Sequence, residues 1–182
     1  MVEQEMKIPV TDLTSARERL RERGWRRLAP LTLEDNWVLD DDGGTLRNSG
    51  RLLRVRQAGR NGWLTLKEPG SFHGGVKSRV EIESPVESAE RVLVILAGLG
   101  FRPVRRYQKR REEWALDEMV VALDETPVGS FVEVEGPGDR LAAAAVDLGL
   151  DPRSAVRGTY LDLWTEYRAL HPTAPTDMVF SE

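Results

Sequence analysis

The chain contains no cysteine and only two histidines, His73 and His171. Without cysteine, disulfides, thiolate catalysis and cysteine-ligated zinc are all excluded. Both histidines lie in segments that we expect to be loop or tail. This placement argues against a Ser-His-Asp hydrolase and against a metal site built from several histidines.

Long apolar runs are also missing. No segment approaches the ~18 consecutive apolar residues of a membrane span, and the first residues are acidic, unlike a signal peptide. A net charge of −4 with 26 basic residues gives no reason to expect nucleic-acid binding. With 182 residues, of which 40% are hydrophobic and 31% charged, the chain fits one globular domain. We therefore expect a cytoplasmic enzyme or binding protein.

Alternation and turn signals predict more strands than helices. The strands are expected at 2–9, 34–40, 51–57, 62–68, 77–84, 105–116, 119–124 and 130–136. The helices are expected at 12–23, at 85–98 behind a capping box at 84–87, at 139–148 and at 153–168. This pattern indicates an α+β fold with an antiparallel sheet or barrel. A nucleotide fold is disfavoured, because the chain has no βαβ rhythm and no GxGxxG or Walker loop.

Acidic residues alternate with apolar ones near both ends of the chain. Glu3, Glu5 and Lys7 occupy every second position, which places them on one face of a strand. Glu133 and Glu135 alternate with valines in the same way. Two neighbouring carboxylates repel each other unless a cation lies between them, so these pairs suggest a divalent metal and phosphate chemistry. For any single strand taken alone, a sheet with one solvated face is the better explanation of the pattern.

Basic residues alternate on the strands between these two acidic pairs. They are Arg54, Arg56, Lys67, Arg79, Lys109 and Arg111. Most are arginines, which suit two-pronged phosphate binding. If the amphipathic helices pack outside a curved sheet, the charged faces line a tunnel, where a metal and a polyphosphate would balance the acids and bases. Further arginines at 105, 106 and 110 leave the register of 105–111 open.

In their order along the chain, these motifs resemble the CYTH superfamily, the triphosphate tunnel metalloenzymes. The matching blocks are Glu3-x-Glu5-x-Lys7, Leu53-Arg54-Val55-Arg56, Leu64-Thr65-Leu66-Lys67, Arg79-Val80-Glu81, Lys109-Arg110-Arg111, Asp124 with the segment 129–135, and Thr159-Tyr160-Leu161. They are most similar to the bacterial class IV adenylyl cyclase-like and thiamine triphosphatase-like branch. The resemblance implies an eight-stranded antiparallel β-barrel, open at both ends, with helices packed on the outside. It also implies a CYTH domain at 1–170 and an irregular tail at 171–182.

The same resemblance implies a Mg²⁺ or Mn²⁺ site and a triphosphate-containing substrate. The expected metal-side acids are Glu3, Glu5, Asp124, Glu133 and Glu135. The expected triphosphate-binding residues are Lys7, Arg54, Arg56, Lys67, Arg79, Lys109 and Arg111. The expected catalytic residues are Glu3, Glu5, Lys7, Glu81 and Asp124, with Glu81 orienting Arg79 or Lys67.

Three functions remain open at this point. The first is a metal-dependent triphosphatase acting on tripolyphosphate, thiamine triphosphate or a nucleoside triphosphate. The second is a class IV adenylyl cyclase that converts ATP to cyclic AMP and pyrophosphate. The third is a non-catalytic polyphosphate binder. The expected partner is a small triphosphate rather than nucleic acid or a membrane, and the sequence is compatible with a homodimer.

Overall fold

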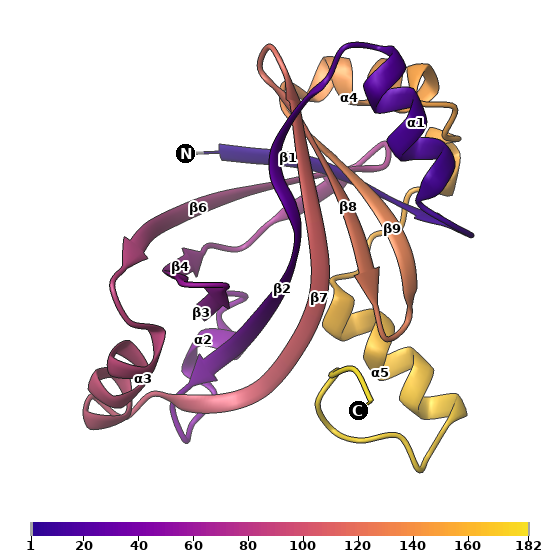
Figure 1. Cartoon of the computed structure of the whole chain (residues 1–182). Helices are drawn as coiled ribbons and strands as arrows, with labels where there is room; N and C mark the ends of the chain where they lie inside the picture. Colours follow the sequence, from indigo (N-terminus) through magenta and orange to yellow (C-terminus); the bar gives the residue numbers. More distant parts are fainter. Residues whose placement is uncertain (1, 182) are drawn as a thin grey trace.

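The computed structural model describes residues 2–181, and its strands form one antiparallel sheet (Figure 1). The end residues of the expected domain and tail, 1 and 182, lie outside this range. The strands are β1 (Val2–Val10), β2 (Arg26–Asp40), β3 (Leu52–Ala58), β4 (Asn61–Lys67), β5 (Ser71–His73), β6 (Val76–Val86), β7 (Arg102–Leu116), β8 (Met119–Thr126) and β9 (Gly129–Glu135). They pair in the order β1-β9-β8-β7-β2-β3-β4-β6, and β6 pairs back with β1. The predicted eight-stranded barrel is therefore confirmed; the ninth strand, β5, lies outside the closed ring on β6 and is not predicted.

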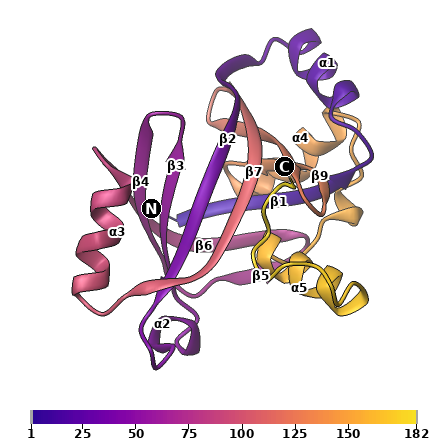
Figure 2. The same cartoon turned by 60° about the horizontal axis from the view of Figure 1, so that its bottom comes forward.

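The helices surround the barrel, as the sequence predicts for an α+β fold (Figures 1 and 2). They are α1 (Thr14–Glu22), α2 (Thr45–Asn48), α3 (Ala89–Gly98), α4 (Gly138–Asp147), the 3₁₀ turn Pro152–Ser154 and α5 (Tyr160–Leu170). The short α2 is not predicted. Within residues 2–181, no helix is both long and apolar enough to cross a membrane.

The main hydrophobic core lies outside the barrel wall, which leaves the interior to charged residues. Met6 and Ile8 of β1 and Val134 of β9 are fully buried beneath α1 and α4, which supply Leu20 and Leu141. Burying such side chains contributes roughly 1.5–3 kcal/mol each. Since side chains alternate across a strand, the residues between them point into the barrel. The outer core thus stabilises a barrel whose inner face is polar.

Two boundaries differ from the prediction because strand pairing overrides local signals. β2 and β7 form one long bulged ladder, so β2 begins at Arg26 rather than at residue 34. The predicted capping box at 84–87 is wrong, because β6 continues to Val86, which pairs with Gly62 of β4. Instead, Ser88 caps α3 by accepting a hydrogen bond from the backbone N–H of Arg91.

The C-terminal part of the chain closes a gap in the barrel wall. The helix predicted at 153–168 is interrupted, and α5 begins only at Tyr160. The chain beyond α5 has no helix or strand in its described part, but it is not loose. Met178 is buried and pairs with β7, where its N–H donates to Arg106 O at 3.0 Å and its C=O accepts from Gln108 N at 2.7 Å. This pairing covers a strand edge that β8 does not reach (Figure 2).

Candidate active site

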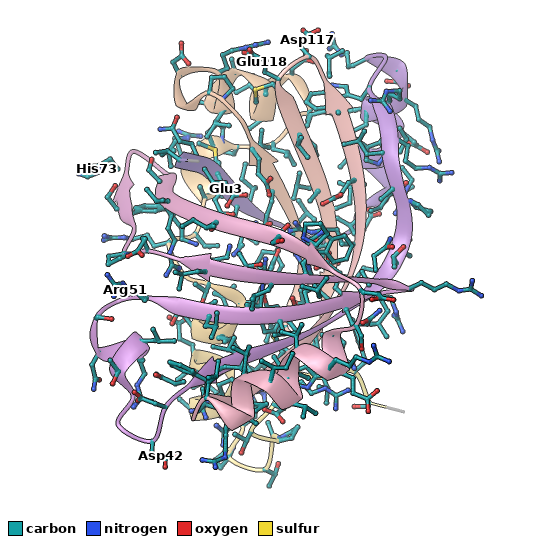
Figure 3. All side chains as sticks on the ribbon, turned by 90° about the vertical axis from the view of Figure 1, so that its left-hand side faces the viewer. Glu3, Asp42, Arg51, His73, Asp117 and Glu118 are labelled. Carbon is teal, nitrogen blue, oxygen red and sulfur yellow. The ribbon has the colours of Figure 1, made fainter. Side chains whose placement is uncertain are left out.

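A cavity of about 660 Å³ occupies the barrel interior. Among the described residues, eight basic and eight acidic side chains line it. The basic ones are Lys7, Arg54, Arg56, Lys67, Lys77, Arg79, Lys109 and Arg111, and the acidic ones are Glu3, Glu5, Glu81, Glu83, Glu113, Glu118, Glu133 and Glu135. Figure 3 shows Glu3 among the interior side chains, whereas His73 and Asp42 lie at the periphery.

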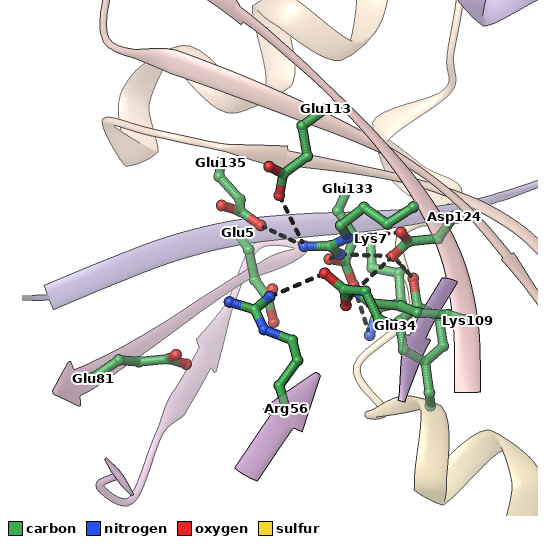
Figure 4. A network of polar contacts seen from close by, with 12 residues as sticks. Glu5, Lys7, Glu34, Arg56, Glu81, Lys109, Glu113, Asp124, Glu133 and Glu135 are labelled. Atoms are coloured by element: carbon green, nitrogen blue, oxygen red, sulfur yellow. Dashed lines mark hydrogen bonds and ion pairs between the residues drawn. The ribbon is translucent and has the colours of Figure 1, made fainter. Parts of the chain in front are cut away.

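Three carboxylates form a cluster where β1 meets β9. Glu5 lies directly opposite Glu135 in the antiparallel register, and Lys7 lies opposite Glu133. Each of Glu5, Glu133 and Glu135 offers an oxygen, and these oxygens all lie within 4.8 Å of one another (Figure 4). We call these three residues the carboxylate cluster.

Each member of the carboxylate cluster faces a cation, since Lys77 lies 2.8 Å from Glu5, Lys7 lies 3.2 Å from Glu133 and Arg111 lies 3.8 Å from Glu135. Burial raises the pKa of Glu135 to about 8; Arg111 opposes this rise, while Glu133 and Glu3 reinforce it. Burial also acts to raise the pKa of Glu133, but Lys7 and Arg111 hold that pKa well below its ordinary value. Three converging carboxylate oxygens, one of them on Glu135, which only a further cation would keep ionised at neutral pH, fit a hard divalent ion such as Mg²⁺ or Mn²⁺.

Glu3 lies beside this cluster but pairs with Glu81. Burial and a hydrogen bond with Glu81 raise the pKa of Glu3 to about 7. Glu81 in turn accepts a hydrogen bond from Lys67 Nζ at 2.5 Å. Of the two partners predicted for Glu81, the structure therefore pairs it with Lys67.

On β3, two arginines are held in place by carboxylates and hydroxyls. Arg54 donates to Glu83 at 3.3 Å and to Tyr107 Oη at 3.3 Å. Arg56 donates to Glu34 and to Glu83, both at 3.1 Å. Arg54 is buried, so Glu83 and Tyr107 fix a guanidinium that water hardly reaches.

Lys109 and Arg111 of β7 form the other basic wall of the cavity. Arg111 donates to both oxygens of Asp124 at 2.7 and 2.6 Å, and also to Glu133. Lys109 lies 3.2 Å from Asp124. Arg110 points outward and pairs with Glu125 at 3.6 Å. The sequence leaves open which basic residues of 105–111 face the interior, and in the structure these are Lys109 and Arg111.

Two predicted site residues lie apart from these groups. Asp124 is fully buried behind Lys109 and Arg111, outside the carboxylate cluster, and it also accepts from Tyr160 Oη at 2.6 Å. Arg79 lines the cavity, but its guanidinium donates to backbone carbonyls, including Gly50 O at 3.1 Å. The predicted residues that do come together form what we call the basic clamp: Lys7, Arg54, Arg56, Lys67, Lys109 and Arg111.

Several inward-facing residues are absent from the predicted site. They are Glu34, Lys77, Glu83, Tyr107 and Tyr160. Tyr107 and Glu83 each lie two positions from a predicted residue on the same strand, so period-two spacing could have indicated them. Burial acts to raise the pKa of Glu34, but the surrounding cations, Lys109 first, lower it to about 2. Glu34 is therefore a permanently charged counterion of the basic clamp.

Fold and cavity together define a class of protein: a closed antiparallel β-barrel with a basic clamp and a carboxylate cluster inside. The CYTH domain family matches residues 1–157. Because this match covers most of the chain, the protein belongs to the CYTH domain family, as its motifs predict.

Three similar proteins illustrate the family. A Methanocaldococcus jannaschii protein named "putative adenylate cyclase" is 29% identical over a 138-residue alignment, and the match covers 74% of this chain and 77% of that protein. A Vibrio parahaemolyticus structure described in the same words superimposes with a TM-score of 0.82 at 17% identity, covering 91% of this chain and 98% of that one. A Hippeastrum structure, described as an adenylyl cyclase of that kind with a dominant triphosphatase activity, has a TM-score of 0.64 at 17% identity, covering 91% and 96%.

Proposed function

We propose that this protein is a metal-dependent triphosphatase acting on tripolyphosphate, thiamine triphosphate or a nucleoside triphosphate. The observation that carries the proposal is that the basic clamp and the carboxylate cluster face one cavity. A triphosphate carries about four negative charges, and guanidinium groups match its oxygens in pairs. A metal on the acids and a triphosphate on the bases would balance both sets of charges at once.

Glu5, Glu133 and Glu135 would hold Mg²⁺ or Mn²⁺. Bound there, the ion would neutralise phosphate charge and polarise a phosphoryl oxygen. Glu3 and Asp124 are further candidates from the sequence motifs. The contacts of Asp124 favour a different role for it, which is to orient the clamp residues on β7.

The basic clamp would bind the three phosphoryl groups and stabilise charge in the transition state. Glu34, Glu83 and Asp124 already hold its side chains in fixed positions, so little reorganisation is needed when the substrate arrives. Catalysis of phosphoryl transfer then depends mainly on positioning and charge neutralisation.

In hydrolysis, a water oxygen attacks the terminal phosphorus, and the bond to the bridging oxygen breaks to release a diphosphate. We assign Glu3 to accept the proton of this water. Its pKa of about 7 is close to the value that favours a general base at neutral pH. Once Glu3 holds that proton, its carboxyl would donate it in a hydrogen bond to Glu81, whose charge Lys67 balances.

The alternative is an adenylyl cyclase, which the printed names of the relatives favour. In that reaction the ribose 3′-hydroxyl attacks the α-phosphorus and releases pyrophosphate, so the site must also hold adenine. The rings that line the cavity in residues 2–181 are those of Tyr107 and Tyr160, and both contact clamp cations. Trp63 lies beneath Arg56, 4.7 Å from its guanidinium, and Trp37 packs in the cluster beside α3. A free stacking platform for a base is therefore lacking among these residues, which favours hydrolysis.

The deciding experiment incubates the purified protein with Mg²⁺ or Mn²⁺ and each of tripolyphosphate, thiamine triphosphate and ATP. Phosphate release without cyclic AMP is the expected result. Cyclic AMP with pyrophosphate would replace this proposal by the cyclase, and tight binding without turnover would leave a polyphosphate binder. Glu133→Gln, assayed in parallel, controls for contaminating phosphatases.

A further inference from the structure

A single aromatic side chain connects several members of the basic clamp. The Nζ atoms of Lys7 and Lys109 lie 3.9 and 5.5 Å from the centre of the Tyr160 ring. The Tyr160 hydroxyl donates to Asp124 Oδ2 at 2.6 Å, and the same carboxylate accepts from Arg111 at 2.6 Å. Two lysines therefore meet the ring directly, and an arginine is linked to it through one carboxylate.

An aromatic ring acts on these lysines differently from a carboxylate. The face of a tyrosine ring attracts an ammonium group, more strongly where water is excluded. It adds no negative charge to the carboxylates that already pair with Lys7 and Lys109, so the ring holds these ammonium groups without further cancelling their charge. The phenol hydroxyl makes a charge-assisted hydrogen bond to Asp124 at the same time. Tyr160 can thus hold the clamp in position while preserving its charge.

Tyr160 is itself fixed from several sides. It is buried at the first position of α5, directly after the capping residue Thr159. Its ring meets that of Phe131 edge-on, with 5.2 Å between centroids. The loop before it is tied to β1, because Lys7 Nζ donates to Gly158 O at 3.3 Å. The position of the ring is therefore set by the barrel and by the helix together.

We propose that Tyr160 is a positioning residue of the triphosphate clamp, with its ring placing Lys7 and Lys109 and its hydroxyl placing Asp124. The inference rests on the proposed function, because it assigns these lysines to the substrate. Tyr160 stands at the start of α5, so this helix contributes a side chain to a cavity that mainly the strands line.

The test measures the Kd of tripolyphosphate for the metal-free full chain in chelator, and KM and kcat with Mn²⁺. Tyr160→Leu removes ring and hydroxyl, and both Kd and KM should rise about tenfold, with a smaller change in kcat. Tyr160→Phe keeps the ring, and its Kd should rise about threefold through Asp124. Trp164→Leu is the matched control, because Trp164 is also buried and lies one turn along α5. Its indole N–H donates a hydrogen bond to the Thr176 carbonyl and its ring stacks on Tyr167 rather than on the clamp lysines. It should lower the Tm and leave Kd within about twofold.

Unchanged Kd and KM in Tyr160→Leu would overturn the inference. So would an equal rise of Kd in Trp164→Leu, because the effect would then belong to the docking of α5. If Tyr160→Leu does not fold, Tyr160→Phe decides the question. A rise of its Kd by about threefold supports the inference, and an unchanged Kd overturns it. A wild-type protein that binds tripolyphosphate without turnover refutes the triphosphatase but leaves this binding test intact, whereas absence of binding both in chelator and with Mn²⁺ overturns both.

Discussion

Glu135 should destabilise the metal-free protein at alkaline pH, and its removal should reverse that effect. The pKa of Glu135 is raised from 4.5 to about 8, chiefly by burial. Between these two values the folded protein keeps a proton that the unfolded chain has lost. The free energy of unfolding therefore falls as pH rises through this window, because the folded state binds more protons. Glu135→Gln carries no titrating carboxyl and should not show this loss.

The size of the effect follows from the two pKa values. A difference of about 3.5 between them corresponds to ~5 kcal/mol, an upper bound for a charge that hydration and relaxation of the cavity partly relieve. We expect roughly 2 kcal/mol, or a Tm higher by about 4–8 °C for a chain of this size. In chelator at pH 9, Glu135→Gln should therefore melt above the unchanged protein, and at pH 5 the gain should largely vanish.

Thermal melts at the two pH values, with chelator and with saturating Mn²⁺, provide the measurement. Glu118→Gln is the control, because Glu118 lines the mouth of the same cavity but is exposed. It should leave the Tm unchanged throughout. With Mn²⁺ the order should invert, since the Glu135→Gln protein lacks one of three proposed ligands. If Glu135→Gln gives no gain in Tm at pH 9 in chelator, the reasoning about the charge of Glu135 in the carboxylate cluster is refuted.

Three further predictions address the site. Glu5→Gln and Glu133→Gln should each abolish triphosphatase turnover with an unchanged far-UV circular dichroism spectrum; full activity in both would reject the carboxylate cluster as the metal site. Arg56→Ala should raise KM about tenfold, because it removes one forked donor from the clamp, and unaltered KM and kcat would count against that role. Metal binding near pH 7 should release about one proton, chiefly from Glu135. Calorimetry in buffers of different ionisation enthalpy measures this release, and buffer-independent heats would contradict it.

Alternation along single strands is enough to predict which side chains enter the barrel. On β1 and β9 the inward charges have outward apolar neighbours, such as Met6 beside Lys7 and Val134 beside Glu133, and only helices outside the barrel can cover those neighbours. The inner face therefore follows from the sequence once the curvature is assumed. The curvature itself is predicted by the family resemblance, because the order of the motifs resembles that of a family of closed barrels.

What alternation does not predict is depth along the barrel. Asp124 and Glu133 have the same period-two spacing, yet Asp124 lies behind the basic wall and Glu133 lies in the carboxylate cluster. Depth depends on the stagger between neighbouring strands, which single-strand patterns do not contain. The bridges from Arg56 to Glu34 and Glu83 are unpredictable for the same reason, because they join three strands. Local helix signals fail at 84–87, where pairing with β4 is the stronger constraint.

The paired charges inside the barrel also explain how a site for so anionic a ligand can be stable before the ligand arrives. Each buried cation of the clamp has a carboxylate partner: Arg54 has Glu83, Lys109 has Asp124 and Lys7 has Glu133. Breaking such a buried pair leaves an uncompensated charge and costs about 3–5 kcal/mol. A triphosphate entering alone would meet these carboxylates, and a metal entering alone would meet these cations. Metal and triphosphate together satisfy both sets, so each should raise the affinity of the barrel for the other.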